Sequence, residues 1–176
     1  DASMVVLGSR GAGGFSALIL GSVSRYVATH ATAPVVVVRE ETMAAHREIV
    51  VGVRDPAQSE TTLGFGFEEA ALRKARVLAL HAWAWSTPGR REAPAEETSR
   101  LESAVATWRE KFPDVEARSE VVHAHPGRVL AGASARAELV VLGRHMPREP
   151  LAAGVGSVTH AVLSHAQGPV VSVPGD

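Results

Sequence analysis

Apolar runs of strand length alternate along this chain with amphipathic stretches that carry most of the charge. The apolar runs predict strands at residues 3–8, 34–39, 49–53, 76–83 and 115–122, and at the runs that begin at Val140 and Val170. The stretches between them predict helices at residues 21–31, 59–75 and 126–136, and a further helix that ends at about residue 111. The strands are nearly continuous in valine and leucine, so both faces of the sheet are expected to be covered. The pattern therefore predicts an α/β fold, with a mostly parallel sheet and helices on both faces.

An internal repeat organises the chain. Residues Ala2–Val38 align with Ala137–Val173 at a constant offset of 135 residues without a gap. An offset of this size is the length of a domain rather than of a solenoid repeat. We therefore expect residues 1–40 to be the closing part of a first domain, 41–47 a linker and 48–176 a complete second domain. The five strands in that second part predict an open five-stranded sheet.

Each copy of the repeat carries a glycine motif between its first strand and its helix. In the first copy, Gly8 and Gly11 are followed by Gly21 and Ser22 at the predicted helix start. Glycines let the backbone approach a ligand closely, and the unpaired amides of a helix start attract anions. The second copy keeps Gly143, Gly156 and Ser157 but has Met146 at the middle position. The first motif is therefore expected to bind phosphate, and the second to bind it more weakly or not at all.

With these two motifs the chain resembles the universal stress protein family, in its tandem two-domain form. The family motif is Gly, two residues, Gly, nine residues, Gly, then Ser or Thr. The resemblance covers nearly the whole chain. It implies a Rossmann-like, adenine nucleotide alpha hydrolase-like fold, and ATP, AMP or ADP as ligand, with magnesium as an accompanying ion. It implies cofactor binding by Gly8, Gly11, Gly21, Ser22, Gly143, Gly156 and Ser157. Two further candidate binding residues, Ala82 and Asp55, are considered next.

The second domain departs from the family pattern at the end of its first strand. Family members that bind ATP usually carry an aspartate there, directed at the nucleoside, whereas this chain has Arg54 and then Asp55. In a strand, a shift of one residue turns the side chain to the opposite face. The adenine contact falls near Ala82, where a backbone contact survives most side chains. Together with Met146, these departures predict weak or absent ATP binding by residues 46–176 alone.

Composition bears on the partners and the location. The chain has 18 basic and 19 acidic residues and no cysteine. The near balance of charge gives little attraction to nucleic acid or anionic lipid, so neither is expected as a partner. The apolar runs are too short to span a membrane. The absence of cysteine fits a reducing compartment, and the expected location is the cytoplasm.

The last strand of each copy suggests how the chain associates. The valine runs Val35–Val38 and Val170–Val173 each follow a proline, which edge strands tolerate. In the family that the chain resembles, the last strand of one domain pairs with that of another. We expect antiparallel pairing of these two strands, within one chain or between chains, and self-association through them. The alternative is that each strand closes its own sheet.

Other candidate residues support no sharper assignment. His123 and His125 supply half a metal site at most, and exposed loop histidines are the favoured interpretation. Arg144, beside the second glycine motif, either meets a phosphate or is a solvated loop charge. Nucleophile, Walker-type lysine and metal-binding carboxylate motifs are not recognisable, so we expect no enzyme activity.

Three functional hypotheses follow. The first is a nucleotide-binding stress-response module that signals through nucleotide-biased dimerisation or through an unknown partner. The second is a nucleotide-independent interaction module, in which the degenerate second site survives only as part of a dimerisation surface. The third, a nucleotide-transferring enzyme with a similar parallel sheet, lacks an acid–base or metal signature and ranks last.

Overall fold

Seven strands lie in one continuous sheet in the order β1-β2-β7-β6-β3-β4-β5. The computed structural model describes residues 3–9, 21–39, 47–83, 94–144 and 156–175. The strands are β1 (Val5–Gly8), β2 (Val35–Val38), β3 (Glu48–Gly52), β4 (Arg76–Trp83), β5 (Ala117–His123), β6 (Leu139–Arg144) and β7 (Val170–Pro174). The predicted α/β class is confirmed, but the sheet has seven strands rather than five. The prediction was wrong because β2 pairs with β7, which joins the strands of both repeat copies.

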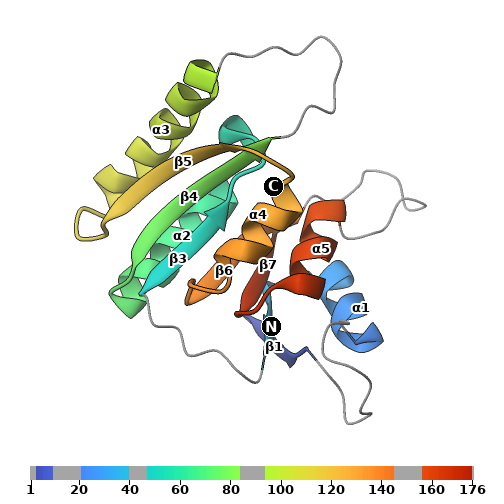
Figure 1. Ribbon diagram of the computed structural model, residues 1–176. Helices are drawn as coiled ribbons and strands as arrows, with labels where there is room; N and C mark the ends of the chain where they lie inside the picture. The colour runs from blue at the N-terminus through green and yellow to red at the C-terminus, as the bar shows by residue number, and fades with distance from the viewer. Residues whose placement is uncertain (1–2, 10–20, 40–46, 84–93, 145–155, 176) are drawn as a thin grey trace.

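Helices cover both faces of this sheet, as Figure 1 shows. They are α1 (Ser22–His30), α2 (Glu60–Arg73), α3 (Pro94–Lys111), α4 (Pro126–Ala133) and α5 (Ser157–His165), with a short 3₁₀ helix η1 at Pro56–Gln58. One core cluster packs α2 and α3 against the sheet through residues such as Phe67 and Leu101. The other packs α1, α4 and α5 against the opposite face. Val50 and Val51 belong to different clusters, because alternate residues of a strand face opposite ways.

The β2–β7 pair is the seam between the two repeat copies. It is antiparallel, with Val36 opposite Val171, whereas every other strand pair of the sheet is parallel. This confirms the predicted antiparallel pairing, within one chain. Val36 and Val171 are repeat equivalents, 135 positions apart. The seam is therefore centred on a pseudo-twofold axis that passes between two equivalent residues.

The helices α1 and α5 show that the repeat extends to backbone geometry. The residue before each helix is a glycine, with φ −57° and ψ 148° at Gly21 and φ −50° and ψ 145° at Gly156. The residue after each helix is an equivalent alanine, whose amide donates to the carbonyl of Val27 in one copy and of Val162 in the other. The two copies thus position their helix starts in the same way.

The helix α2 lies unusually close to its neighbours because two of its residues are glycines. A Cβ added at Gly66 would lie 2.3 Å from Cγ2 of Val51 in β3, and one added at Gly64 would lie 2.6 Å from the Trp108 ring of α3. Both contacts are shorter than any carbon–carbon contact that a folded protein tolerates. The two glycines therefore set how closely α2 packs on the sheet and on α3.

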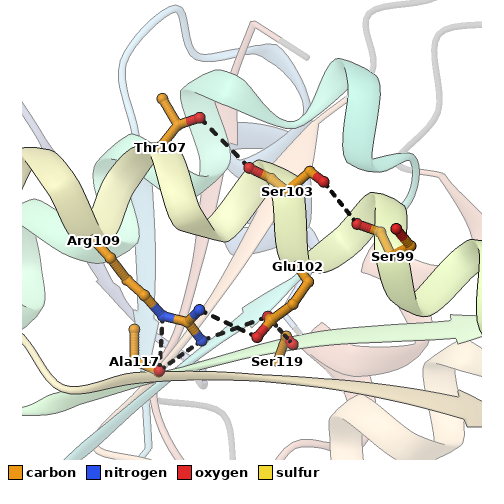
Figure 2. A network of polar contacts seen from close by, with 7 residues as sticks. All are labelled: Ser99, Glu102, Ser103, Thr107, Arg109, Ala117 and Ser119. Atoms are coloured by element: carbon orange, nitrogen blue, oxygen red, sulfur yellow. Dashed lines mark hydrogen bonds and ion pairs between the residues drawn. The ribbon is translucent and has the colours of Figure 1, made fainter.

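A polar network fixes α3 to the edge strand β5 (Figure 2). The guanidinium of Arg109 donates to the carbonyl of Ala117 and to the carboxylate of Glu102. The hydroxyl of Ser119 donates to the same carboxylate over 2.5 Å. The Ser119 hydrogen bond, with a smaller contribution from Arg109, lowers the pKa of Glu102 from its ordinary value. The carboxylate is therefore held in its charged form. The network attaches α3 to β5, the outermost strand on this side of the sheet.

The element boundaries follow the sequence pattern closely in the second copy. The strand predicted at residues 76–83 has those bounds, and the predicted helix at 59–75 is observed at 60–73. Ser59 directly precedes α2, and its hydroxyl donates to the carbonyl of Asp55 instead of capping the helix. None of the helices in the described part of the chain is long and apolar enough to cross a bilayer. The proposed division into two domains stays a prediction, and most of its linker lies outside the described residues.

Candidate functional site

The strand order creates a crevice between β3 and β6. From β3 the chain continues through β4 and β5 in one direction, whereas β6 and β7 lie on the other side. In open α/β sheets, ligands bind beyond the carboxyl ends of the strands at such a switch point. A pocket of about 240 Å³ lies there, lined by the ends of β3, β4 and β6 and by the starts of α2, α4 and α5. The volume is slightly below the range of about 300–1,000 Å³ that is usual for small-molecule sites.

The floor of the pocket is apolar. It includes Leu80, Ala82, Leu130 and Leu142. Gly52, at the end of β3, lets these side chains come together, because a Cβ there would lie 2.7 Å from Leu142 Cδ2 and 3.1 Å from Leu130 Cδ2. A flat apolar floor of this kind suits an aromatic or aliphatic ligand group.

The start of α5 forms the polar wall of the pocket. The first helical hydrogen bond runs from the amide of His160 to the carbonyl of Gly156, so the amides of Ser157, Val158 and Thr159 have no partner within the helix. A Cβ added at Gly156 would meet nothing within 4 Å, so this helix start is open. The helix dipole places about half a positive charge here. The wall can therefore hold an anionic group.

Hydroxyl and amide side chains complete the lining. Besides Ser157, the described lining residues with a hydroxyl or amide side chain are Gln58, Ser59, Thr62 and Thr159. Sequence reasoning missed these four residues. A usable signal did exist, because the first turn of a helix that follows a parallel strand borders the same edge of the sheet. Gln58, Ser59 and Thr62 occupy that turn and the 3₁₀ helix before it.

Of the predicted site residues, Ala82, Gly143, Gly156 and Ser157 line this one pocket. Asp55 does not line it. Its carboxylate accepts the amide of Ala57 over 3.0 Å and caps η1. Arg54, the residue before it, does line the pocket. The side chain at the end of β3 that borders the cavity is therefore basic.

The first glycine motif lies at the opposite ends of the strands. Because β2 and β7 are antiparallel, β1 and β6 run in opposite directions, and their carboxyl ends lie on opposite sides of the sheet. Gly8 ends β1, and Gly21 and Ser22 lie at the start of α1, where the Ser24 hydroxyl donates to the carbonyl of Gly8 over 2.8 Å. The two glycine motifs therefore cannot share a ligand. Gly11 and Met146, their middle positions, lie outside the described residues.

His81 holds the rim of the pocket from the side of β4. Its buried ring contacts the carbonyl of Val53 through Nδ1 over 2.8 Å, and Nε2 lies 3.7 Å from a carboxylate oxygen of Glu97 in α3. A carbonyl only accepts hydrogen bonds, so Nδ1 carries a proton and donates it. The backbone just before Arg54 is thereby fixed to the neighbouring strand.

Arg144 fulfils neither of the roles considered for it. Its side chain is buried, and its guanidinium donates to the carbonyls of Ala28, over 2.7 Å, and of Ala31. These carbonyls lie at the end of α1, where the helix dipole favours a cation. Burial lowers the pKa of Arg144 from its ordinary value. The residue links the end of β6 to the other repeat copy rather than meeting a ligand or solvent.

A metal centre is not formed by the described residues, since no group of three histidine, aspartate or glutamate side chains among them could hold an ion. His123 instead packs against Trp83, with ring centroids 4.5 Å apart. The features that the described residues bring together are therefore an apolar floor, an open helix start and one cation at the rim.

Sequence comparisons agree with this architecture. A sequence model described as the Universal stress protein family matches residues 1–39 and 46–174. Universal stress protein Rv2005c of Mycobacterium tuberculosis is 35% identical over 181 residues, which are 97% of this chain and 61% of that protein. The chain thus spans about three fifths of the length of this curated relative.

Comparisons of structure give the same fold. A universal stress protein from Archaeoglobus fulgidus DSM 4304 matches with a TM-score of 0.71 and 19% identity, over 98% of this chain and 62% of that one. Another from Archaeoglobus fulgidus, solved in complex with dAMP, matches with a TM-score of 0.53 and 22% identity, over 74% of this chain and 99% of that one. A further universal stress protein was solved in complex with cAMP and matches with a TM-score of 0.59 and 20% identity, over 75% of this chain and 99% of that one.

Proposed function

The chain belongs to the universal stress protein family, and from this premise we propose that it is an adenine-nucleotide-binding module of a stress-response protein. The observation that carries the proposal is the pocket at the switch point, whose apolar floor lies beside the open start of α5. The floor suits the base, and the helix start suits a phosphate. Two structural neighbours were solved with dAMP and with cAMP, which supports adenine as the base.

The size of the pocket suits a small ligand. A cavity of about 240 Å³ lies just below the usual range for small-molecule sites, so AMP is the smallest adenine nucleotide with which to test it. We assign no catalytic step to the site and propose that the ligand acts through the assembly of the protein. A ligand biases association only if it binds one associated state better than another. In this proposal the protein works in the cytoplasm, and its stress-response partner is unidentified.

We also propose that residues 3–39 are the closing part of a first domain in a tandem protein. Exposed apolar residues of the first copy support this, since their repeat equivalents are covered. Val6 is 60% exposed, whereas its equivalent Val141 is fully buried. Tyr26 is 64% exposed, whereas its equivalent Ala161 packs against α4 at Gly127. In the second copy, β3, α2 and α4 cover the residues equivalent to Val6 and Tyr26. The described part of the first copy has no counterparts of these three elements.

The same surface supports the second candidate function, a nucleotide-independent interaction module. Val6, Val23 and Tyr26 are three of the four exposed large apolar residues among those described, and all three belong to the first copy. Such a surface associates with another protein segment whether or not a nucleotide is bound. Binding measurements separate the two candidates, because only the first requires the pocket.

Replacing Gly156 with aspartate is expected to weaken AMP binding roughly tenfold without destabilising the fold. The new carboxylate would accept the free amides of α5 and repel the phosphate. Because aspartate caps helices well, the stability of the ligand-free protein should stay constant or rise by a few tenths of a kcal/mol. Isothermal titration with AMP and thermal unfolding without ligand measure the two effects.

Gly156→Ala is the matched control. Its methyl group meets nothing within 4 Å and offers no hydrogen-bond acceptor, so it should leave AMP affinity within about twofold of the parent. Equal AMP affinity in the aspartate and alanine variants would contradict binding at α5. Absence of AMP, ADP and ATP binding in the parent chain would favour the interaction module.

A further inference from the structure

An arginine lies at the rim of the pocket. Arg54 is the only charged residue among the described residues that line the cavity, and its side chain is exposed. It makes no hydrogen bond or ion pair within the described part of the chain. A ligand that pairs with Arg54 therefore does not have to break an existing interaction.

The acidic residue next to Arg54 in sequence does not neutralise it. Asp55 follows Arg54 directly, but its carboxylate is turned toward the amide of Ala57 and lies outside the pocket lining. The other described side chains of the lining are neutral. The helix dipole of α5 adds positive potential at the helix start, which also lines the pocket. Both sources of charge in the pocket thus have the same sign.

Arg54 and the start of α5 line the same cavity. Gly52 pairs with Leu142, so the chain beyond Gly52 leaves the sheet beside Gly143. Neighbouring strands lie about 4.8 Å apart. Arg54 and Gly143 line the same cavity as Gly156 and Ser157, and the backbone before Arg54 is held by His81. A long arginine side chain on this fixed base is well placed to meet a group bound at the helix start.

We propose that Arg54 selects the ligand of this pocket by charge, so that the site takes phosphate-bearing ligands, binds them more tightly as their phosphates increase, and discriminates against the uncharged nucleoside. The inference rests on the proposed function for the adenine part of the ligand and extends it to the anionic part. The guanidinium supplies a planar pair of donors that matches two phosphate oxygens. A carboxylate at this position would instead repel phosphates and accept ribose hydroxyls.

The test compares adenosine, AMP, ADP and ribose 5-phosphate by isothermal titration against the parent chain, Arg54→Gln and Arg54→Asp. In the parent we expect AMP to bind at least tenfold more tightly than adenosine, and ADP more tightly than AMP. Arg54→Gln should lower AMP affinity roughly five- to tenfold, since it removes one charge-assisted contact, and should leave adenosine affinity unchanged. Arg54→Asp should reverse the order of AMP and adenosine. Raising the salt concentration should weaken AMP binding less in Arg54→Gln than in the parent.

Arg136→Gln is the matched control, because it removes the same charge from an exposed arginine that precedes β6 and lies outside the pocket lining. It should leave every affinity within about twofold of the parent. An unchanged ratio of AMP to adenosine affinity in Arg54→Gln would overturn the inference, as would binding of no phosphate ligand at all. If ribose 5-phosphate binds in an Arg54-dependent way but adenine adds no affinity, the inference holds and the proposed adenine specificity fails.

Discussion

Replacing Val36 with proline is expected to separate residues 3–39 from the rest of the sheet. Val36 lies at the centre of the seam, opposite Val171 in β7 and beside Val6 in β1. Both edges of β2 are paired, so its amide has a ladder partner on one side or the other. Proline removes that donor and leaves the facing carbonyl unpaired, at a cost of about 1–3 kcal/mol, and native sheets confine proline to edge strands and bulges. Beyond the seam, the first copy is joined to the second by the hydrogen bonds of Arg144 and Arg39 and by core contacts of α1, and we expect this segment to detach before the second copy unfolds.

Hydrogen exchange of the amides measures this result. In Val36→Pro, the amides of α1 and β2 should lose protection, while those of β3, β4 and β5 keep theirs. Val6→Pro is the control. The amides of Val5 and Ser9 donate to β2, so the amide of Val6 points away from the sheet. Proline at Val6 should therefore cost less than about 1 kcal/mol. Loss of protection throughout the chain in Val36→Pro would show that the two copies unfold as one unit.

Replacing Gly66 with alanine is expected to destabilise the protein, although alanine is the better helix former. The gain in helix propensity is about 1 kcal/mol. Against it stands the contact of the new methyl group with Val51, 2.3 Å from Cγ2, in a fully buried position. Valine has little rotamer freedom, so the backbone must move, and overpacking of this kind costs about 1–3 kcal/mol. The steric cost should exceed the gain, and urea denaturation should show a lower free energy of unfolding.

Two further variants make this result specific. Gly132→Ala in α4 adds the same methyl group where nothing lies within 4 Å, so it should stabilise the protein by about 0.5–1 kcal/mol. Adding Val51→Ala to Gly66→Ala removes the opposing side chain. The double variant should then be more stable than the sum of the single changes predicts, by about 1 kcal/mol or more. Additive effects would mean that Gly66 and Val51 do not constrain each other.

The sequence predicted the repeated unit well because its signals are local. Valine runs, the glycines before α1 and α5 and the proline before each last strand are all read within a few residues. The seam was predicted from these terminal strands together with the family resemblance, yet the strand count was wrong. The second copy was counted as a closed sheet of five strands, whereas the predicted pairing itself extends that sheet through β2 to β1. The error lay in treating the two predictions separately.

The side chains of the site were harder to foresee, because their directions depend on partners distant in sequence. Asp55 was expected at the ligand, but η1 begins directly after it and its carboxylate caps that turn. Arg144 was considered for a ligand or solvent role, but α1 comes from the other copy, more than a hundred residues away, and its end receives the guanidinium. Gln58 and Thr62 line the pocket only because α2 starts at the same edge as α5. Periodicity determines elements, and the packing of those elements determines where polar groups point.

The pseudo-twofold seam gives each residue near its centre a neighbour that descends from the same position. Val36 faces Val171, its own duplicate, which is the geometry of a homodimer fused into a single polypeptide. In an unfused dimer, any substitution at such a position appears on both sides at once. Fusion removes that constraint, and Val37 now corresponds to Ser172, a buried serine whose hydroxyl has no hydrogen-bond partner in the described part of the chain. The residues on the two sides of the pseudo-twofold axis can therefore differ in this protein, which a symmetric homodimer cannot achieve by a single mutation.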